Sequence, residues 1–88
     1  MATWFRYHTT ALNHPKVQRL PPHLFKFWVN ILCVASTHDG VLPGTEDLAY
    51  MLRRRSGDVR RDVAALLARR LLDTVDGNVV PHDWNNDL

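Results

Sequence analysis

The stretch TEDLAYMLRRRSGDVRRDVAALLARRLLDTVDGNVVPH, residues 45–82, decides the fold. Its apolar spacing predicts two short helices, one from Thr45 to about Arg53 and one from Asp58 to about Arg70. Thr45 and Ser56 are residue types that cap helix N-termini, so we expect each to act as a capping residue. Two helices across a tight turn that contains a glycine have the spacing of a helix-turn-helix.

A hairpin is predicted after the second helix. Two runs rich in β-forming residues, 71–75 and 78–82, flank the dipeptide Asp76-Gly77, which is a strong signal for a tight hairpin turn. Pro81 restricts its strand to a sheet edge, because proline has no N–H to donate. A helix-turn-helix followed by a hairpin has the element order of a winged helix.

The residues before this stretch add a buried helix. Pro22 opens a predicted helix that runs to about His38, and its few polar positions fall on one narrow stripe, so we expect it to form the spine of the core. A short strand over residues 4–7 and one or two helical turns over residues 14–20 are expected before it. We therefore predict a single domain over residues 1–88, mainly α with a small β wing, in the α+β class: a winged helix-turn-helix.

Positive charge is concentrated in one window of the chain. Residues 53–70 contain seven arginines and two aspartates, a net charge of +5, whereas the rest of the chain holds four basic and seven acidic residues, a net charge of −3. Such a separation is typical of a protein that binds a polyanion. The alternative interpretation is a solvated helix whose arginine stems cover core side chains.

The arginines of this window are the candidate binding residues. A second helix that turns Val59 and Leu66 toward the core turns Arg61, Ala65 and Ala68 outward. Arg61 is the first candidate for base or phosphate contact, because its planar guanidinium bonds guanine or phosphate through two N–H groups. The predicted DNA-binding residues are Arg53, Arg54, Arg55, Arg60, Arg61 and Arg69. The window contains no aromatic residue, which favours double-stranded over single-stranded DNA.

The alanines of the same helix support a second hypothesis. Ala64, Ala65 and Ala68 are small enough to let another helix approach closely, so this face is also a candidate partner interface. The runner-up function is therefore a winged-helix protein-interaction module that does not bind DNA. Its partner is then a second copy of the chain, in a homodimer or larger assembly, or a replication or host protein.

Other kinds of site find little support in the sequence. The five histidines show no metal-ligand spacing and Cys33 is the only cysteine, so we expect no metal site and no internal disulfide. No glycine-rich phosphate loop or exposed nucleophile turn is present, so we expect neither an enzyme nor a cofactor. The longest apolar run, residues 27–35, is too short to cross a membrane and no signal peptide is visible, which predicts a cytoplasmic protein.

Four short segments resemble a known family. They are Trp4-Phe5-Arg6, Pro15-Lys16-Val17, the loop Asp39-Gly40-Val41-Leu42-Pro43 and the ending His82-Asp83-Trp84. In this order they resemble the amino-terminal winged-helix domain of phage and prophage replication proteins, the replisome-organiser or DnaD-like initiators. The resemblance implies a module for DNA binding or assembly in replication, encoded by a phage or prophage and acting in the bacterial cytoplasm.

Two features depart from this family. Family members usually continue beyond the terminal tryptophan into a linker and a second domain, so we expect residues 1–88 to be either a short protein or the N-terminal module of a longer one. The predicted wing, residues 72–82, carries Asp73 and Asp76 and no Lys or Arg, so we expect the arginine helix to supply the DNA contacts. The sequence therefore predicts a double-stranded DNA-binding module in phage replication or transcription regulation.

Overall fold

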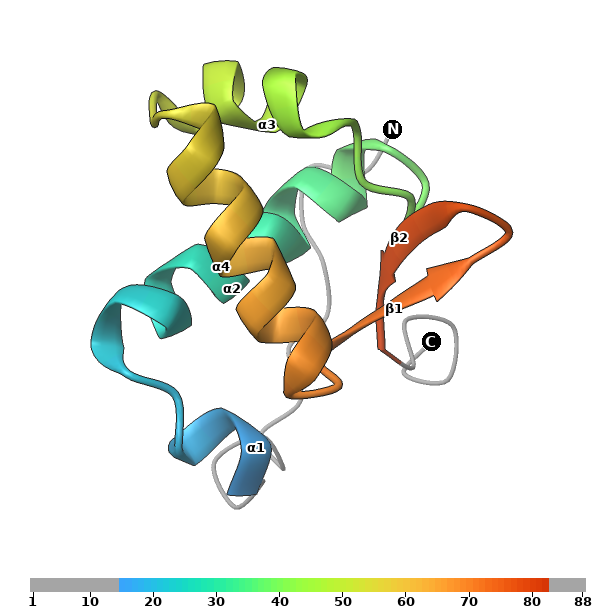
Figure 1. Cartoon of the computed structure of the whole chain (residues 1–88). Coiled ribbons are helices and arrows are strands. Elements are labelled where there is room, and N and C mark those ends of the chain that lie inside the picture. The colour runs from blue at the N-terminus through green and yellow to red at the C-terminus, as the bar shows by residue number, and fades with distance from the viewer. Residues whose placement is uncertain (1–14, 83–88) are drawn as a thin grey trace.

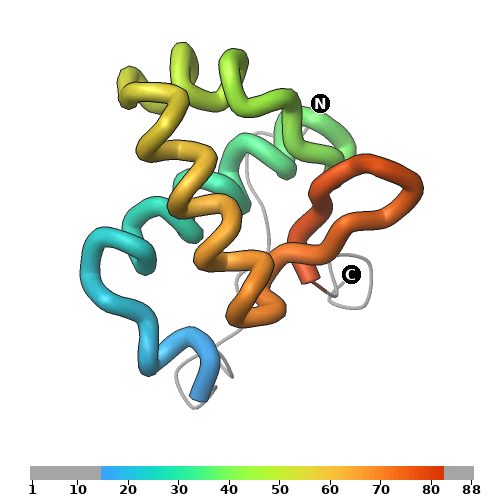
Figure 2. Tube along the Cα trace, in the orientation of Figure 1, coloured from blue at the N-terminus to red at the C-terminus, as the bar shows by residue number. Residues whose placement is uncertain are grey.

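The computed structural model describes residues 15–82. Within that range, helices precede a two-stranded antiparallel sheet (Figures 1 and 2). The elements are α1 (Pro15–Gln18), α2 (Pro22–Thr37), α3 (Thr45–Leu52), α4 (Ser56–Ala68), β1 (Leu72–Val75) and β2 (Asn78–Pro81). The predicted strand over residues 4–7 lies outside the described residues. The described part is mostly helical and carries a small sheet, in the α+β class.

The two central helices begin at residues other than the expected caps. α3 begins at Thr45 itself after Gly44, and α4 begins at Ser56 after Arg55, two residues earlier than predicted. Gly44 and Arg55 have the extended backbone of N-cap residues, and neither forms a side-chain capping hydrogen bond. The capping roles predicted for Thr45 and Ser56 are therefore wrong, because the change from extended to helical backbone falls one residue before each of them.

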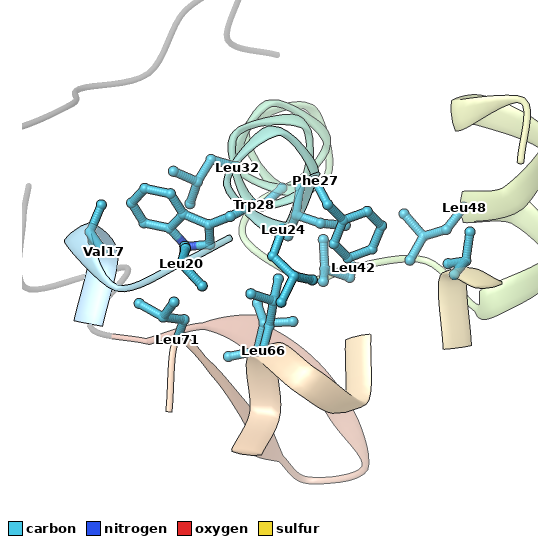
Figure 3. Close-up of a cluster of buried hydrophobic side chains, with 14 of the residues drawn as sticks. Val17, Leu20, Leu24, Phe27, Trp28, Leu32, Leu42, Leu48, Leu66 and Leu71 are labelled. Carbon is cyan, nitrogen blue, oxygen red and sulfur yellow. The ribbon is translucent and has the colours of Figure 1, made fainter. Parts of the chain in front are cut away.

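α2 runs through the middle of the domain, and its side chains reach in several directions (Figure 3). Trp28 lies toward Leu20, which follows α1, whereas Phe27 lies on the side of Leu48 from α3. Leu66 of α4 approaches α2 between these two groups and is fully buried. The prediction that this helix forms the spine of the core is confirmed.

α3 and α4 both end at a left-handed residue that is not glycine. Arg53 has φ of 55° and Arg70 has φ of 59°. After α4, the N–H of Arg70 donates to the carbonyl of Leu67. The next N–H, that of Leu71, donates to the carbonyl of Leu66, which completes a Schellman motif. Leu66 and Leu71 are both buried, so the motif leads the chain from α4 through the core into β1.

The hairpin forms as predicted. Asp76 and Gly77 have φ of 52° and 80°, and positive values at both positions are what a type I′ turn requires. The N–H of Leu42, in the loop before α3, donates to the carbonyl of Val79 at 2.9 Å. This bond ties the loop to the edge of β2, so the hairpin is anchored to the helical part as well as joined to α4.

A buried ion pair joins the α3–α4 turn to α4. Asp62 is 2% exposed, and its Oδ2 lies 2.8 Å from Nη1 of Arg54. Among the described residues no donor is aligned with Oδ2 as a hydrogen bond, so charge attraction holds the pair. The guanidinium of Arg54 also lies over the ring of Phe27, 5.4 Å from its centroid. Arg54 thereby fixes the turn against both α4 and α2.

We predict that Arg54→Met destabilises the domain by about 3 kcal/mol, because it leaves the Asp62 carboxylate buried without its closest partner. The double variant Arg54→Met/Asp62→Leu should recover most of that loss, since both charges are then replaced by apolar groups. Urea unfolding followed by circular dichroism measures the differences. Arg55→Met, a control at the next residue, should change the free energy of unfolding by less than about 0.5 kcal/mol. Losses that simply add in the double variant would contradict the ion pair.

We also predict that Arg70→Gly is more stable than Arg70→Ala by about 1 kcal/mol, because only glycine adopts a positive φ without steric cost. Both variants remove the same charge, so the difference isolates the backbone term. Ala68→Gly, inside α4, is the matched control and should destabilise by about 1 kcal/mol. Thermal unfolding of the three variants tests the order, and equal stability of the two Arg70 variants would refute it.

Candidate nucleic-acid interface

The side of α4 that faces solvent is rotated about the helix axis, by part of a turn, from the side predicted to face solvent. Its exposed residues between 60 and 68 are Arg60, Arg61, Ala64 and Ala68. Ala65 packs partly buried against the core, so its predicted outward position is wrong. The reason is Asp62, whose burial turns that side of α4 inward. The candidate partner face is therefore reduced to Ala64 and Ala68.

The predicted arginines separate into one structural residue and five surface residues. Arg54 is half-buried, with 32% of its side chain exposed, because it pairs with Asp62. The exposed members of the predicted set are Arg53, Arg55, Arg60, Arg61 and Arg69. Arg70 is exposed as well, although it was not among the predicted residues.

Acidic neighbours compensate only part of this charge. Arg61 lies 3.7 Å from Asp58 and 3.6 Å from Asp62. Arg55 and Arg60 have no acidic group within ion-pair distance in residues 15–82. Arg55 is moreover the N-cap residue of α4, at the positive pole of the helix dipole, where a second positive charge is unfavourable. An anion bound beside this helix end would relieve that repulsion.

Arginines occur at both ends of α4. Arg55 comes directly before the helix, and Arg69 and Arg70 come directly after it. The helix has 13 residues and is therefore about 20 Å long. The small side chains of Ala64 and Ala68 lie between the two groups of charges. Exposed arginines therefore occur on α4 and at both of its ends, with small side chains at Ala64 and Ala68.

The hairpin does not extend this positive surface. Asp76 at its turn is exposed, and residues 71–82 contain no Lys or Arg. Asp73 already has a side-chain partner, because its Oδ2 lies 2.7 Å from Nδ1 of His82. Of the hairpin and the elements next to it, α4 and the turns at its two ends therefore carry the exposed arginines.

A hollow beside α3 is a feature that the sequence did not reveal. It is open to solvent, has a volume of about 810 Å³, and is lined in part by Tyr50, Met51, Arg53 and Ser56. Tyr50 is 86% exposed and Met51 is 45% exposed. Two large apolar side chains beside an arginine thus stand on the surface of this helix.

The exposure of Met51 corrects an expectation about α3. Apolar spacing predicts Leu48, Met51 and Leu52 as the buried residues of this helix. In the structure Ala49 is buried with Leu48, and Met51 faces solvent. The small Ala49 lets α3 pack closely against the neighbouring helices, and this turns the helix so that Tyr50 and Met51 point outward.

Residues 15–82 contain no group of three or more His, Cys, Asp or Glu side chains that could hold a metal ion. No helix in that range is long and apolar enough to span a membrane. Cys33 is exposed on α2. Trp4 and Trp84, which belong to the segments that carry the family resemblance, lie outside the described range.

The chain matches no protein-family model, no curated protein and no solved structure. A function for the chain is therefore inferred from the geometry and charge of α4 and its surroundings.

Proposed function

We propose that this chain is a winged helix-turn-helix module that binds double-stranded DNA through the outward face of α4. The observation that carries the proposal is the set of exposed arginines on α4 and at its two ends, with Arg55 at the positive pole of the helix and no acidic group within ion-pair distance of it in residues 15–82. A duplex presents a dense array of phosphates and therefore supplies anions in series.

The elements around α4 are compatible with groove binding. α3 and α4 are separated by three residues, and the hairpin begins three residues after α4, an order that supports α4 as the recognition helix and the hairpin as the wing. The major groove is about 12 Å wide and admits one α-helix. Ala64 and Ala68 let the backbone of α4 approach the groove floor without steric obstruction.

Affinity in this arrangement comes mainly from phosphate contacts. Arg55 and Arg69, at the two ends of α4, would contact the backbones on either side of the groove, which position the protein without reading sequence. Arg60 would add a further phosphate contact, whereas Arg61, near the helix start, can meet a base edge or a phosphate. The alanines have no polar group for base readout, so we infer modest sequence preference and strong dependence on salt.

The same face has a second candidate occupant, a partner helix packed on Ala64 and Ala68. The observation that favours it is their exposure on a helix with few large side chains between the arginines. A partner with acidic residues would then take the place of the phosphates. The proposed setting, replication or regulation of a phage or prophage genome, depends on the sequence resemblance alone.

Fluorescence anisotropy of a labelled generic duplex, titrated with the full chain at several salt concentrations, tests the proposal. About five phosphate contacts predict a log–log salt slope of roughly −4 to −5 and a micromolar dissociation constant at low salt. Arg55→Ala/Arg60→Ala should weaken binding by about tenfold or more and reduce the magnitude of the slope by about 2. Neither arginine has an acidic partner in the described range, so the fold should tolerate this variant.

The matched control is Arg19→Ala/Lys26→Ala, which removes the same charge from exposed positions outside α3 and α4. It should retain the wild-type salt slope and bind within about threefold of wild type, because distant charges are largely screened. Equal losses in the two double variants would mean that net charge, rather than the α4 face, causes binding. Absence of binding at low salt would refute the DNA proposal and leave the partner-helix candidate.

A further inference from the structure

Large hydrophobic side chains are exposed at few places in residues 15–82. Those that are exposed are Val41, Tyr50, Met51 and Val75. Tyr50 and Met51 adjoin the hollow beside α3, whereas Val75 stands at the far end of β1, next to the hairpin turn. Isolated apolar side chains on a surface are ordinary, but Tyr50 and Met51 lie beside basic residues and Val75 lies beside an acidic one.

The hollow beside α3 has the composition of a protein-binding surface. Tyr, Met and Arg are the residue types enriched in protein interfaces, and Tyr50, Met51 and Arg53 all line it. Arg53 and Arg54 make its rim basic, with Glu46 as the single acid. An occupant that fits this chemistry combines an apolar side chain with neighbouring carboxylates.

The hairpin of the same chain has that composition. Val75 is 51% exposed and is followed directly by Asp76 in the exposed turn. Strand alternation places Asp73 on the same face as Val75, because the two residues are separated by one position. The face thus consists of an apolar side chain between two carboxylates, without any basic residue from 71 to 82 except His82.

The two surfaces lie on different sides of the domain and cannot meet within one molecule. In Figures 1 and 2 the hairpin turn points away from the helices, and the α3–α4 turn lies at the opposite side of the domain. A contact between them must therefore join two molecules. It pairs different surfaces on each copy, so it is a head-to-tail contact that leaves one hollow and one hairpin free for further copies.

We propose that the chain self-associates head to tail, with the Val75–Asp76 end of one hairpin seated in the hollow beside α3 of a second copy. The hydrophobic contact joins Val75 to Tyr50 and Met51, and Asp76 pairs with Arg53. Neither surface includes Arg60, Ala64 or Ala68, so the outward face of α4 stays accessible. The proposal uses no property of DNA and stands independently of the proposed function.

Sedimentation velocity of the full chain, without nucleic acid, tests the proposal. A contact this small predicts weak association, so the average mass should rise above the monomer mass of 10.2 kDa only between roughly 10 µM and 1 mM protein. The rise should diminish at about 1 M salt, because the charge pairs are exposed and therefore screened. Arg53→Glu and Val75→Lys should each shift the apparent dissociation constant by tenfold or more. Arg19→Glu, with the same change in charge as Arg53→Glu, should associate like wild type.

Mixing the two variants gives the decisive result. Arg53→Glu keeps an intact hairpin and Val75→Lys keeps an intact hollow, so an equimolar mixture should regain a complex that neither variant forms alone. Recovery by mixing also shows that both variants are folded. A wild-type chain that stays monomeric up to about 1 mM would refute the proposal. Association that persists in both variants, or that mixing fails to restore, would place the contact on other surfaces and equally overturn it.

Discussion

Burial of the Asp62 carboxylate is the constraint on which the arrangement of the helices depends. Removing an ionised carboxylate from water costs several kcal/mol, and a core of this size cannot offset that cost without a close positive partner. Arg54 supplies the partner from the turn, at 2.8 Å, while its guanidinium lies over Phe27 of α2. The turn between α3 and α4 must therefore return Arg54 toward the core. The same pair fixes the rotation of α4 about its axis and so decides which residues that helix exposes.

The three consecutive arginines of the turn illustrate how this constraint divides identical side chains. Arg53 holds the left-handed position that ends α3, and its side chain borders the hollow. Arg54 is directed inward by Asp62. Arg55 adopts the extended backbone of the residue before α4 and is exposed at the positive pole of that helix. Of the three adjacent charges, Arg53 borders the hollow, Arg54 has a buried acidic partner, and Arg55 has no acidic group within ion-pair distance in residues 15–82.

Periodicity in the sequence predicted the helices and the hairpin because these elements follow from local spacing and turn chemistry. It placed α2 in the core and the turn at Asp76-Gly77 correctly. It did not identify Asp62 as buried, because periodicity considers apolar residues alone, although Asp62 lies three residues after Val59 and four before Leu66 in the buried stripe. Ala65 and Met51 were misplaced for a related reason: the rotation of a short helix is set by tertiary packing, which apolar spacing alone does not determine.

The negative charge of the hairpin affects how the domain could lie beside a polyanion and beside another protein. A polyanion lying along α4 repels carboxylates near it, so Asp73 and Asp76 favour an orientation in which the hairpin turn points away from the ligand. Asp73 is hydrogen-bonded to His82, whereas Asp76 is exposed at the tip. Long-range charge is sufficient to attract a duplex, whereas a protein contact needs buried apolar surface as well. The hairpin has exposed apolar surface at Val75. In the proposed self-association, negative charge that is unfavourable beside DNA is favourable beside the basic rim of another copy's hollow. The separation of positive and negative charge along the chain would then keep the outward face of α4 apart from the hairpin that joins two copies.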